Sequence, residues 1–297
     1  MSHDISKTQQ DAWFTEHYNT LKNLNEYIID SCLKAQDKES TIFDTHQHIQ
    51  IILDTWENFP TEESREHTLH DLLLEAGGLF LQNEICTPQE KNNDIAARLL
   101  EEALNLGKVA YPTAIHQPML ATNTSLGMAL LQNDKKKDAV EALQRALYIG
   151  EQLESEAKNA YIEISDQEFI SCMITTCEAL AVLAKDESIT KSINLYKRAI
   201  TYYQLGNMDS DAFDDMIEVL KTIGSLALER EGEIEDDVLE HVELGVLLLG
   251  NHLNQDTPEL IPLLILLHKI YDRRNESEKS KAVADRISSL IDVKKAI

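Results

Sequence analysis

The sequence predicts an all-α protein built as a solenoid of about six antiparallel helix pairs, or about twelve helices. Glycine contributes only 10 of the 297 residues and proline only 6, which is typical of long helices joined by short turns. Apolar residues recur at steps of three and four along almost the whole chain, and no long stretch alternates with period two. The stretch 121–150 also places small and large residues at fixed positions on two consecutive helices.

The apolar periodicity and the helix-start signals together give the helix boundaries. Thr257 before Pro258, and Asn275 with Glu278, are typical of helix starts, because such side chains cap free amide groups. Pro262 would remove a hydrogen bond inside a helix that began at Pro258, so we expect that helix to begin about a turn later. The expected helices span 8–36, 40–58, 62–82, 89–110, 114–132, 136–157, 166–184, 188–205, 209–230, 233–253, 259–273 and 276–294.

The stretch Ala121–Gly150 carries the clearest repeat. Two antiparallel helices approach closely only where a small side chain lies at their crossing and bulky neighbours surround it. The first helix offers Leu126, Gly127 and Leu130, and the second offers Ala139, Leu143 and Ala146. Weaker copies follow the same pattern, and the small-residue position of the second helix recurs at 96, 139, 192, 238 and 280.

These residues resemble the tetratricopeptide repeat (TPR) superfamily, whose pattern asks for a large–small pair in the first helix and Ala–large–Ala in the second. The steps between second helices are 43, 53, 46 and 42 residues, longer than the common 34-residue repeat. The long period is similar to that of the kinesin-light-chain-like members. The resemblance implies a right-handed solenoid, with TPR-like repeats over 61–297 and an N-terminal helical pair or cap over 1–60. We therefore expect one helical repeat domain, 1–297.

The charge of the chain favours a basic protein or peptide as partner. Lys and Arg number 27 against 52 Asp and Glu, a formal net charge of −25, which repels nucleic acid and anionic membranes. The four cysteines show no spacing typical of a zinc site or a disulfide framework, and the N-terminal stretch lacks the apolar run of a signal peptide. We expect a cytoplasmic protein with no cofactor and no metal.

The resemblance implies that the first helices of the pairs line a concave, partner-binding surface. The helical spacing predicts that its groove-facing side chains are Thr124, Met128, Gln132, Cys177, Glu178, Lys221, Ser225 and Glu229. The expected function is a non-catalytic protein-interaction module or scaffold that binds a partner segment on this acidic surface.

Three alternatives stay open. His48 and the His70–Asp71 pair are similar to the metal ligands of histidine-aspartate phosphohydrolases, in which a metal activates water. Residues 1–60 are long enough to form an effector bundle, as in TPR-containing regulators that sense peptides. In the third alternative, the array serves only as a spacer or as half of a homodimer.

Overall fold

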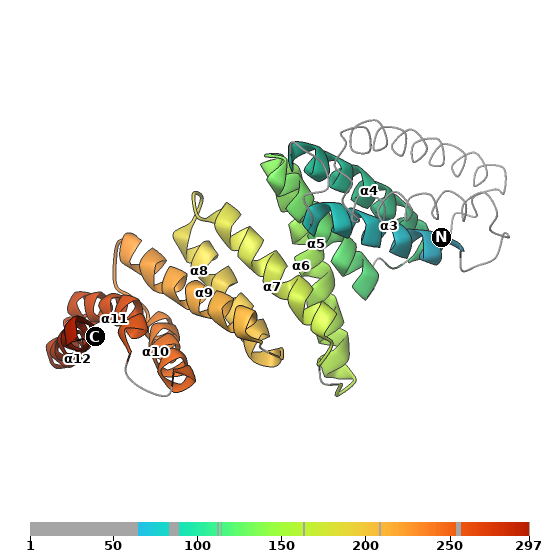
Figure 1. Ribbon diagram of the computed structural model, residues 1–297. Helices are drawn as coiled ribbons and strands as arrows, with labels where there is room; N and C mark the ends of the chain where they lie inside the picture. Colours follow the sequence, from blue (N-terminus) through green and yellow to red (C-terminus); the bar gives the residue numbers. More distant parts are fainter. Residues whose placement is uncertain are drawn as a thin grey trace. The chain divides into compact units, whose positions relative to one another are not determined.

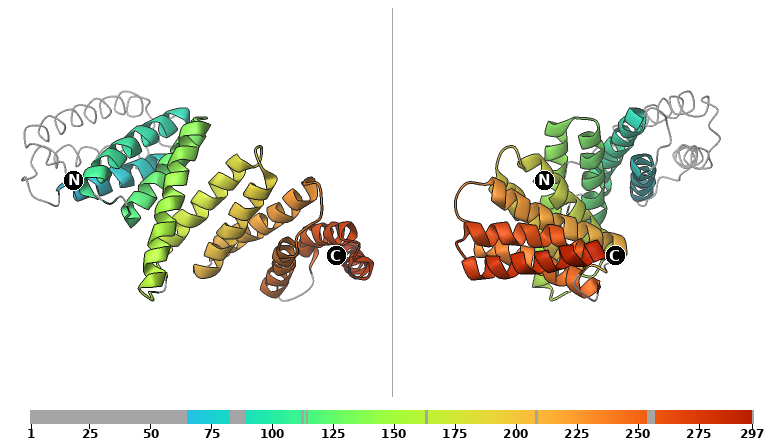
Figure 2. Two further views of the ribbon diagram at one scale, coloured as in Figure 1. Left: turned by 180° about the vertical axis from the view of Figure 1, so that it is seen from behind. Right: turned by 60° about the vertical axis from the view of Figure 1, so that its left-hand side comes forward.

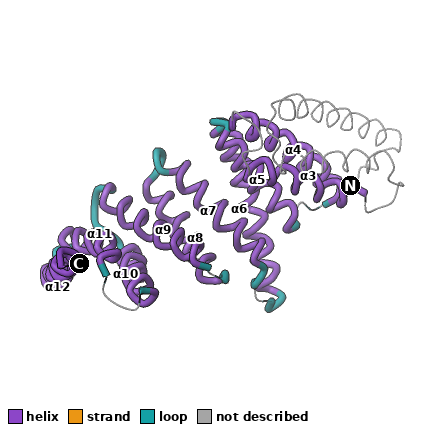
Figure 3. The backbone as a smooth tube through the Cα atoms, in the orientation of Figure 1, coloured by secondary structure: helices purple, strands orange, loops and turns teal. Residues whose placement is uncertain are grey.

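The computed structural model describes residues 65–82, 89–111, 113, 115–162, 164–207, 209–253 and 257–296. These residues form helices joined by loops, and none of them lies in a strand (Figure 3). The two helices expected over 8–36 and 40–58 lie outside the described residues. The α-helices are α3 (Arg65–Gln82), α4 (Gln89–Ala110), α5 (Gln117–Gln132), α6 (Lys136–Asn159), α7 (Gln167–Ala184), α8 (Ile189–Leu205), α9 (Ser210–Glu229), α10 (Asp236–His252), α11 (Ile261–Arg273) and α12 (Ser277–Ala296).

Consecutive helices pack as pairs within two compact units, Met1–Ile164 and Ser165–Ile297. In the first unit α3 packs on α4, and α5 packs on α6. In the second unit the pairs are α7 with α8, α9 with α10 and α11 with α12 (Figures 1 and 2). The described helices begin and end within three residues of the expected boundaries. The all-α class is therefore confirmed, and the single domain 1–297 stays a prediction.

The start of α11 shows how proline sets a boundary. Pro258–Leu260 forms one 3-10 turn, and α11 begins at Ile261 with Pro262 in its first turn, where the missing amide hydrogen costs no helix hydrogen bond. Two predicted starts are wrong in detail. The Thr257 hydroxyl is buried and makes no capping bond, and Asn275 has a φ of 59°, so it ends α11 in a left-handed conformation instead of capping α12.

Glycines mark the closest crossings between paired helices, as the repeat pattern predicts. A Cβ on Gly77 would lie 2.6 Å from Leu100 Cγ, and one on Gly127 would lie 2.5 Å from Leu143 Cγ. Real Cβ atoms do not approach neighbours so closely, so a larger residue at either position would force the opposite leucine or the helix crossing to shift. The partner residues are the large residues that the second-helix pattern places between its small positions.

The recurring small-residue positions of the second helices all lie in the interior. Their residues are Ala96, Ala139, Ser192, Val238 and Ser280, and none is more than 3% exposed. The Ser192 hydroxyl donates to the carbonyl oxygen of Ala181, which satisfies its one polar group inside the α7–α8 crossing. The burial of all five positions agrees with the repeat register predicted from the sequence.

One described helix, α7, is long and apolar enough to cross a membrane by length and composition. Half of its 18 residues are buried within the protein, and a core helix can pass the same test of length and composition. Its buried residues include Phe169, Met173 and Leu180; the polar Thr176 is buried among them, and Ser171 is exposed.

Candidate partner-binding pocket

A pocket of about 490 Å³ opens between α7, α8 and the start of α9, within the second unit. Elsewhere in this unit α9 packs directly on α11, but no comparable packing joins α7 and α9. The pocket occupies the space between them. Its lining residues are Gln167, Ile170, Ser171, Ile174, Thr175, Glu178, Tyr203, Gly206, Asn207, Asp209, Asp211, Ala212 and Asp215.

The α8–α9 loop is held against α7 by three local features. Gly206 ends α8, and a Cβ there would lie 3.2 Å from Ile170 Cγ2, so a larger residue would require a shift of a few tenths of an ångström. The backbone amide of Asn207 donates to Gln167 Oε1 at 3.1 Å. Asp209 then caps α9 by accepting from the Ala212 amide at 2.9 Å. These contacts place the α8–α9 loop beside the first turn of α7, at the edge of the pocket.

Every charged side chain that lines the pocket is acidic: Glu178, Asp209, Asp211 and Asp215. Asp209 is engaged as the helix cap, and Asp211 accepts from the Ser210 hydroxyl at 3.3 Å. Asp215 makes no hydrogen bond or ion pair with another described residue. Two aliphatic side chains, Ile170 and Ile174, line the same space, so the pocket combines apolar contact area with negative charge.

Glu178 is the most buried of these carboxylates. Burial raises its pKa, the hydrogen bond from Tyr203 opposes that shift, and the negative charge of Asp215 adds to it. The Tyr203 hydroxyl donates to Glu178 Oε1 at 2.9 Å. Burial first, and then the charge of Glu178, raise the pKa of Tyr203, so this phenol stays protonated and holds the carboxylate in place. A cation in the pocket would relieve the repulsion between Glu178 and Asp215.

Farther along α9 the acidic residues are already neutralised. Glu218 pairs with Lys221 on the same helix, and Glu229 pairs with Lys185 at the end of α7, with 3.2 Å between Lys185 Nζ and Glu229 Oε2. The unneutralised negative charge of this surface therefore lies at the pocket end of α9.

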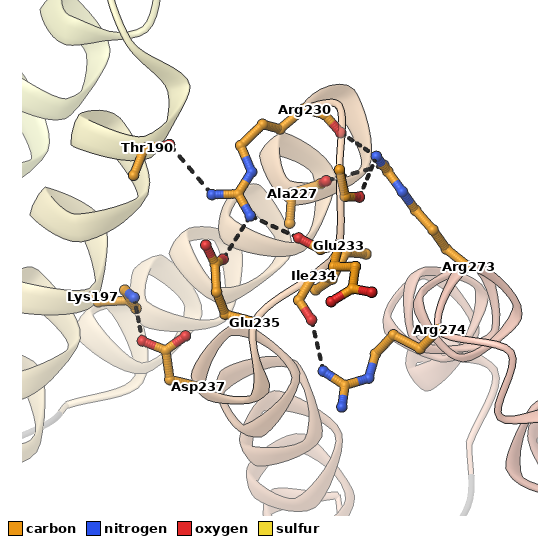
Figure 4. A network of polar contacts seen from close by, with 11 residues as sticks. Thr190, Lys197, Ala227, Arg230, Glu233, Ile234, Glu235, Asp237, Arg273 and Arg274 are labelled. Carbon is orange, nitrogen blue, oxygen red and sulfur yellow. Dashed lines mark hydrogen bonds and ion pairs between the residues drawn. The ribbon is translucent and has the colours of Figure 1, made fainter.

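An arginine network fixes the opposite end of α9 (Figure 4). The guanidinium group of Arg273 on α11 donates to the carbonyl oxygens of Leu228 and Gly232 at 2.9 Å each, and also to those of Ala227 and Arg230. Arg274 reaches the carbonyl oxygen of Ile234 at 2.7 Å. These bonds satisfy the last carbonyl groups of α9 and the loop that follows, so they hold α9 in position against α11.

The residues that the sequence predicted as a binding surface are placed in three ways. Glu178 lines the pocket. Lys221, Ser225 and Glu229 lie farther along α9, where Ser225 donates to the Lys221 carbonyl oxygen and the two charged residues are paired. In the first unit, Met128 is half-buried and Gln132 is exposed on α5.

Two members of the predicted set do not offer their side chains to a partner. Thr124 is 5% exposed and its hydroxyl donates to the Leu120 carbonyl oxygen of the preceding turn. Cys177 is fully buried. Both lie on the side of their helix that packs inward, one position away from the exposed stripe, and we correct the predicted surface by leaving them out.

The sequence prediction missed the aspartates of the pocket and Tyr203. One signal for the aspartates is present, because four of the seven residues from Asp209 to Asp215 are aspartate. A single cap accounts for only one of them. Tyr203 lies 25 residues from Glu178, and only the packing of α8 on α7 brings the two together.

The geometry around His70 does not favour the phosphohydrolase alternative. His70 is fully buried, its Nδ1 lies 2.9 Å from Asp71 Oδ1, and its Nε2 lies 2.8 Å from the Thr122 hydroxyl. Both ring nitrogens are therefore already bonded, and neither is free to bind a metal. Within the described ranges, no three His, Cys, Asp or Glu side chains are grouped so that they could hold a metal ion. His48 lies outside the described residues.

Serine, histidine and aspartate also meet between α11 and α12, but their geometry is structural. The Ser280 hydroxyl contacts His268 Nδ1 at 2.7 Å and donates to Asp272. Ser280 is 3% exposed and occupies a small-residue position of the repeat. Because this hydroxyl is buried at a helix crossing, it is not accessible as a nucleophile. The cluster ties the last helix pair together.

The comparisons with known proteins bear on the fold. No family model matches the chain, and no curated protein matches its sequence. Among solved structures it is similar to BtubC (BKLC) from P. vanneervenii, a kinesin light chain-like repeat protein, with a TM-score of 0.50 and 16% sequence identity. The match covers 88% of this chain and 94% of that one. The chain therefore has a TPR-like, all-α solenoid fold.

Proposed function

We propose that this chain is a non-catalytic interaction protein whose pocket between α7, α8 and α9 docks a basic segment of a partner protein. The observation that carries the proposal is the pocket itself: about 490 Å³, lined by four carboxylates and, among the described residues that line it, by no Lys, Arg or His. Pockets of this size bind ligand groups through apolar walls and a few polar anchors. Helix-pair repeats with exposed first helices offer such sites at fixed intervals.

Three further observations support a basic partner. The formal net charge of −25 draws positively charged segments toward the chain. The carboxylates on the far half of α9 are paired internally, so the pocket end is where a cation gains most. Asp215, which has no hydrogen bond or ion pair with a described residue, faces the same space as the half-buried Glu178.

The kinesin-light-chain-like assignment of the repeats belongs to this proposal. It is supported by the long repeat period and by the similarity to BtubC. A cytoplasmic location remains part of the same proposal. It is supported by the spacing of the four cysteines, which is not that of a disulfide framework, and by the negative net charge. The alternative of a peptide-sensing regulator depends on residues 1–60, which lie outside the described residues.

A charge-reversal titration tests the proposal with a control one residue away. Asp214 and Asp215 are neighbours on α9 and both are exposed, but only Asp215 lines the pocket. A fluorescent peptide of alternating basic and small residues should bind the wild-type chain, and binding should weaken as salt rises. Asp215→Lys should weaken it about tenfold or more, and Asp214→Lys should change it much less. Equal losses in both variants would show that only overall charge matters, and no binding at low salt would refute the proposal.

A further inference from the structure

The lining of the pocket allows a sharper statement about what enters it. Its inner wall, which α7 provides, alternates aliphatic and polar groups: Ile170 and Ile174 lie among Ser171, Thr175 and Glu178. Asp215 closes the opposite side from α9. A ligand that fits has an apolar stem to cover the isoleucines and a cationic head that donates several hydrogen bonds.

We propose that the pocket receives a single arginine side chain of the partner, with its guanidinium group between Glu178 and Asp215. This inference rests on the proposed function and names the anchor of the docked segment. The three methylenes of arginine cover the isoleucine wall while its charged head reaches the carboxylates. Five N–H donors in a planar fork match the acceptors in the pocket: two carboxylates and the Ser171 and Thr175 hydroxyl oxygens.

Arginine fits this pocket better than lysine for a reason of hydration. Glu178 is half-buried, so an incoming cation must give up part of its own water. A guanidinium group is more weakly hydrated than an ammonium group and loses less on burial. The planar guanidinium group also donates hydrogen bonds to two acceptors at once, whereas an ammonium group acts as a point charge. Neither argument depends on the residues that flank the arginine in the partner.

Tyr203 acts as a positioning residue for this site. Its hydroxyl donates to Glu178 Oε1, which leaves the other carboxylate oxygen, Oε2, for the ligand. The groups that face Glu178 from the neighbouring helices are Tyr203 and Tyr196 on α8 and Asp215 on α9. Because burial and Asp215 raise the pKa of Glu178, acidification neutralises this carboxylate before an ordinary surface glutamate, and arginine binding should weaken over that range.

Methyl spectra of the intact chain test the anchor directly. Isoleucine δ-methyl groups are labelled with ¹³C, and N-acetyl-arginine amide is titrated to millimolar concentration beside N-acetyl-lysine amide and the neutral isostere N-acetyl-citrulline amide. The arginine probe should shift the Ile170 and Ile174 methyl signals along a saturable curve and leave Ile265, which lies outside the pocket, unchanged. The lysine probe should bind about threefold or more weakly, and citrulline at least about tenfold more weakly.

Single substitutions test which pocket residues bind the arginine probe. Glu178→Gln and Asp215→Asn should each weaken arginine binding about tenfold, and Asp214→Asn should leave it unchanged. Tyr203→Phe should weaken it less, and should also move the pH midpoint of binding, which a purely structural substitution would not do. A thermal melt of each variant confirms that it is folded.

The outcomes distinguish this inference from the proposed function. If lysine binds as tightly as arginine, and Asp215→Asn weakens both, the pocket is a basic docking site but the arginine anchor is wrong. If citrulline binds as tightly as arginine, or no probe moves Ile170 and Ile174 while the basic peptide still binds, the anchor is also overturned. If neither the amides nor the basic peptide bind, the proposed function fails with it.

Discussion

Two adjacent glycines of α3 allow the predicted helix crossing to be tested with an internal control. A Cβ on Gly77 would lie 2.6 Å from Leu100 Cγ and 2.9 Å from Leu100 Cδ2, but a Cβ on Gly78 would meet nothing within 4 Å. Both glycines lie in the interior of the helix, so replacement by alanine gains about 1 kcal/mol of helix propensity at either position. That term cancels when the two variants are compared.

The two variants should therefore differ in sign or in size. Overpacking in a close crossing costs about 1–3 kcal/mol, so Gly77→Ala should range from nearly neutral to about 2 kcal/mol destabilising. Gly78→Ala should stabilise by about 0.5–1 kcal/mol. The expected difference between them is about 1–3 kcal/mol. Leu100 is fully buried, so it has little room to move aside.

Hydrogen exchange is the suitable assay, because a chain with two compact units need not unfold in one step. Exchange of the α4 amides should speed up in Gly77→Ala relative to Gly78→Ala. In a Leu100→Ala background the clash is gone, so Gly77→Ala should become stabilising, which a double-mutant cycle measures. If both glycine variants stabilise α4 equally in the wild-type background, the assigned crossing is wrong.

Three other predictions concern single side chains. Burial lowers the pKa of His70 below its ordinary value of 6.5, so the unfolded chain binds a proton more readily than the folded chain. The stability of the α3–α5 region should therefore be full above pH 6.5 and fall as the pH is lowered. In urea titrations at successive pH values, His70→Gln should make that fall smaller. Arg273→Met removes hydrogen bonds to four carbonyl oxygens and should lower the stability of this region by about 1–3 kcal/mol. Hydrogen exchange in the α9–α10 loop should become faster. Arg273→Lys should restore only part of that stability, whereas full recovery would show that charge alone suffices. Lys136 lies at the positive end of the α6 dipole, so Lys136→Glu should stabilise α6 by about 0.3–1 kcal/mol. The melting temperature should rise, and the rise should shrink at high salt. An unchanged melting temperature at low salt would contradict this reasoning.

The helices and their crossings could be predicted from the sequence because both depend on local signals. A period of 3.6 residues marks each buried face, and a glycine opposite a large residue, such as Gly127 opposite Leu143, marks a crossing within one pair. The start of α11 followed from the chemistry of Pro262. Thr257 was mispredicted, because a capping side chain is only one of several ways to satisfy a helix end.

The pocket could be predicted only in part. Glu178 follows from its position on the exposed stripe of α7, but Cys177, the next residue on the same helix, faces inward and is buried. A helical spacing rule places a residue to within about one position, which is enough to move a side chain from the surface to the core. Asp215 and Tyr203 join Glu178 through the packing of three helices, and no local pattern in the sequence encodes that meeting.

The most direct test of the docking pocket is a hydrogen-exchange footprint of the basic peptide on the intact chain, read with and without Asp215→Lys. Binding at the pocket should slow exchange in the first turns of α7 and α9 and in the loop between α8 and α9, and Asp215→Lys should abolish that protection. Protection that lies in the first unit, or that persists at the pocket in Asp215→Lys, would contradict the account.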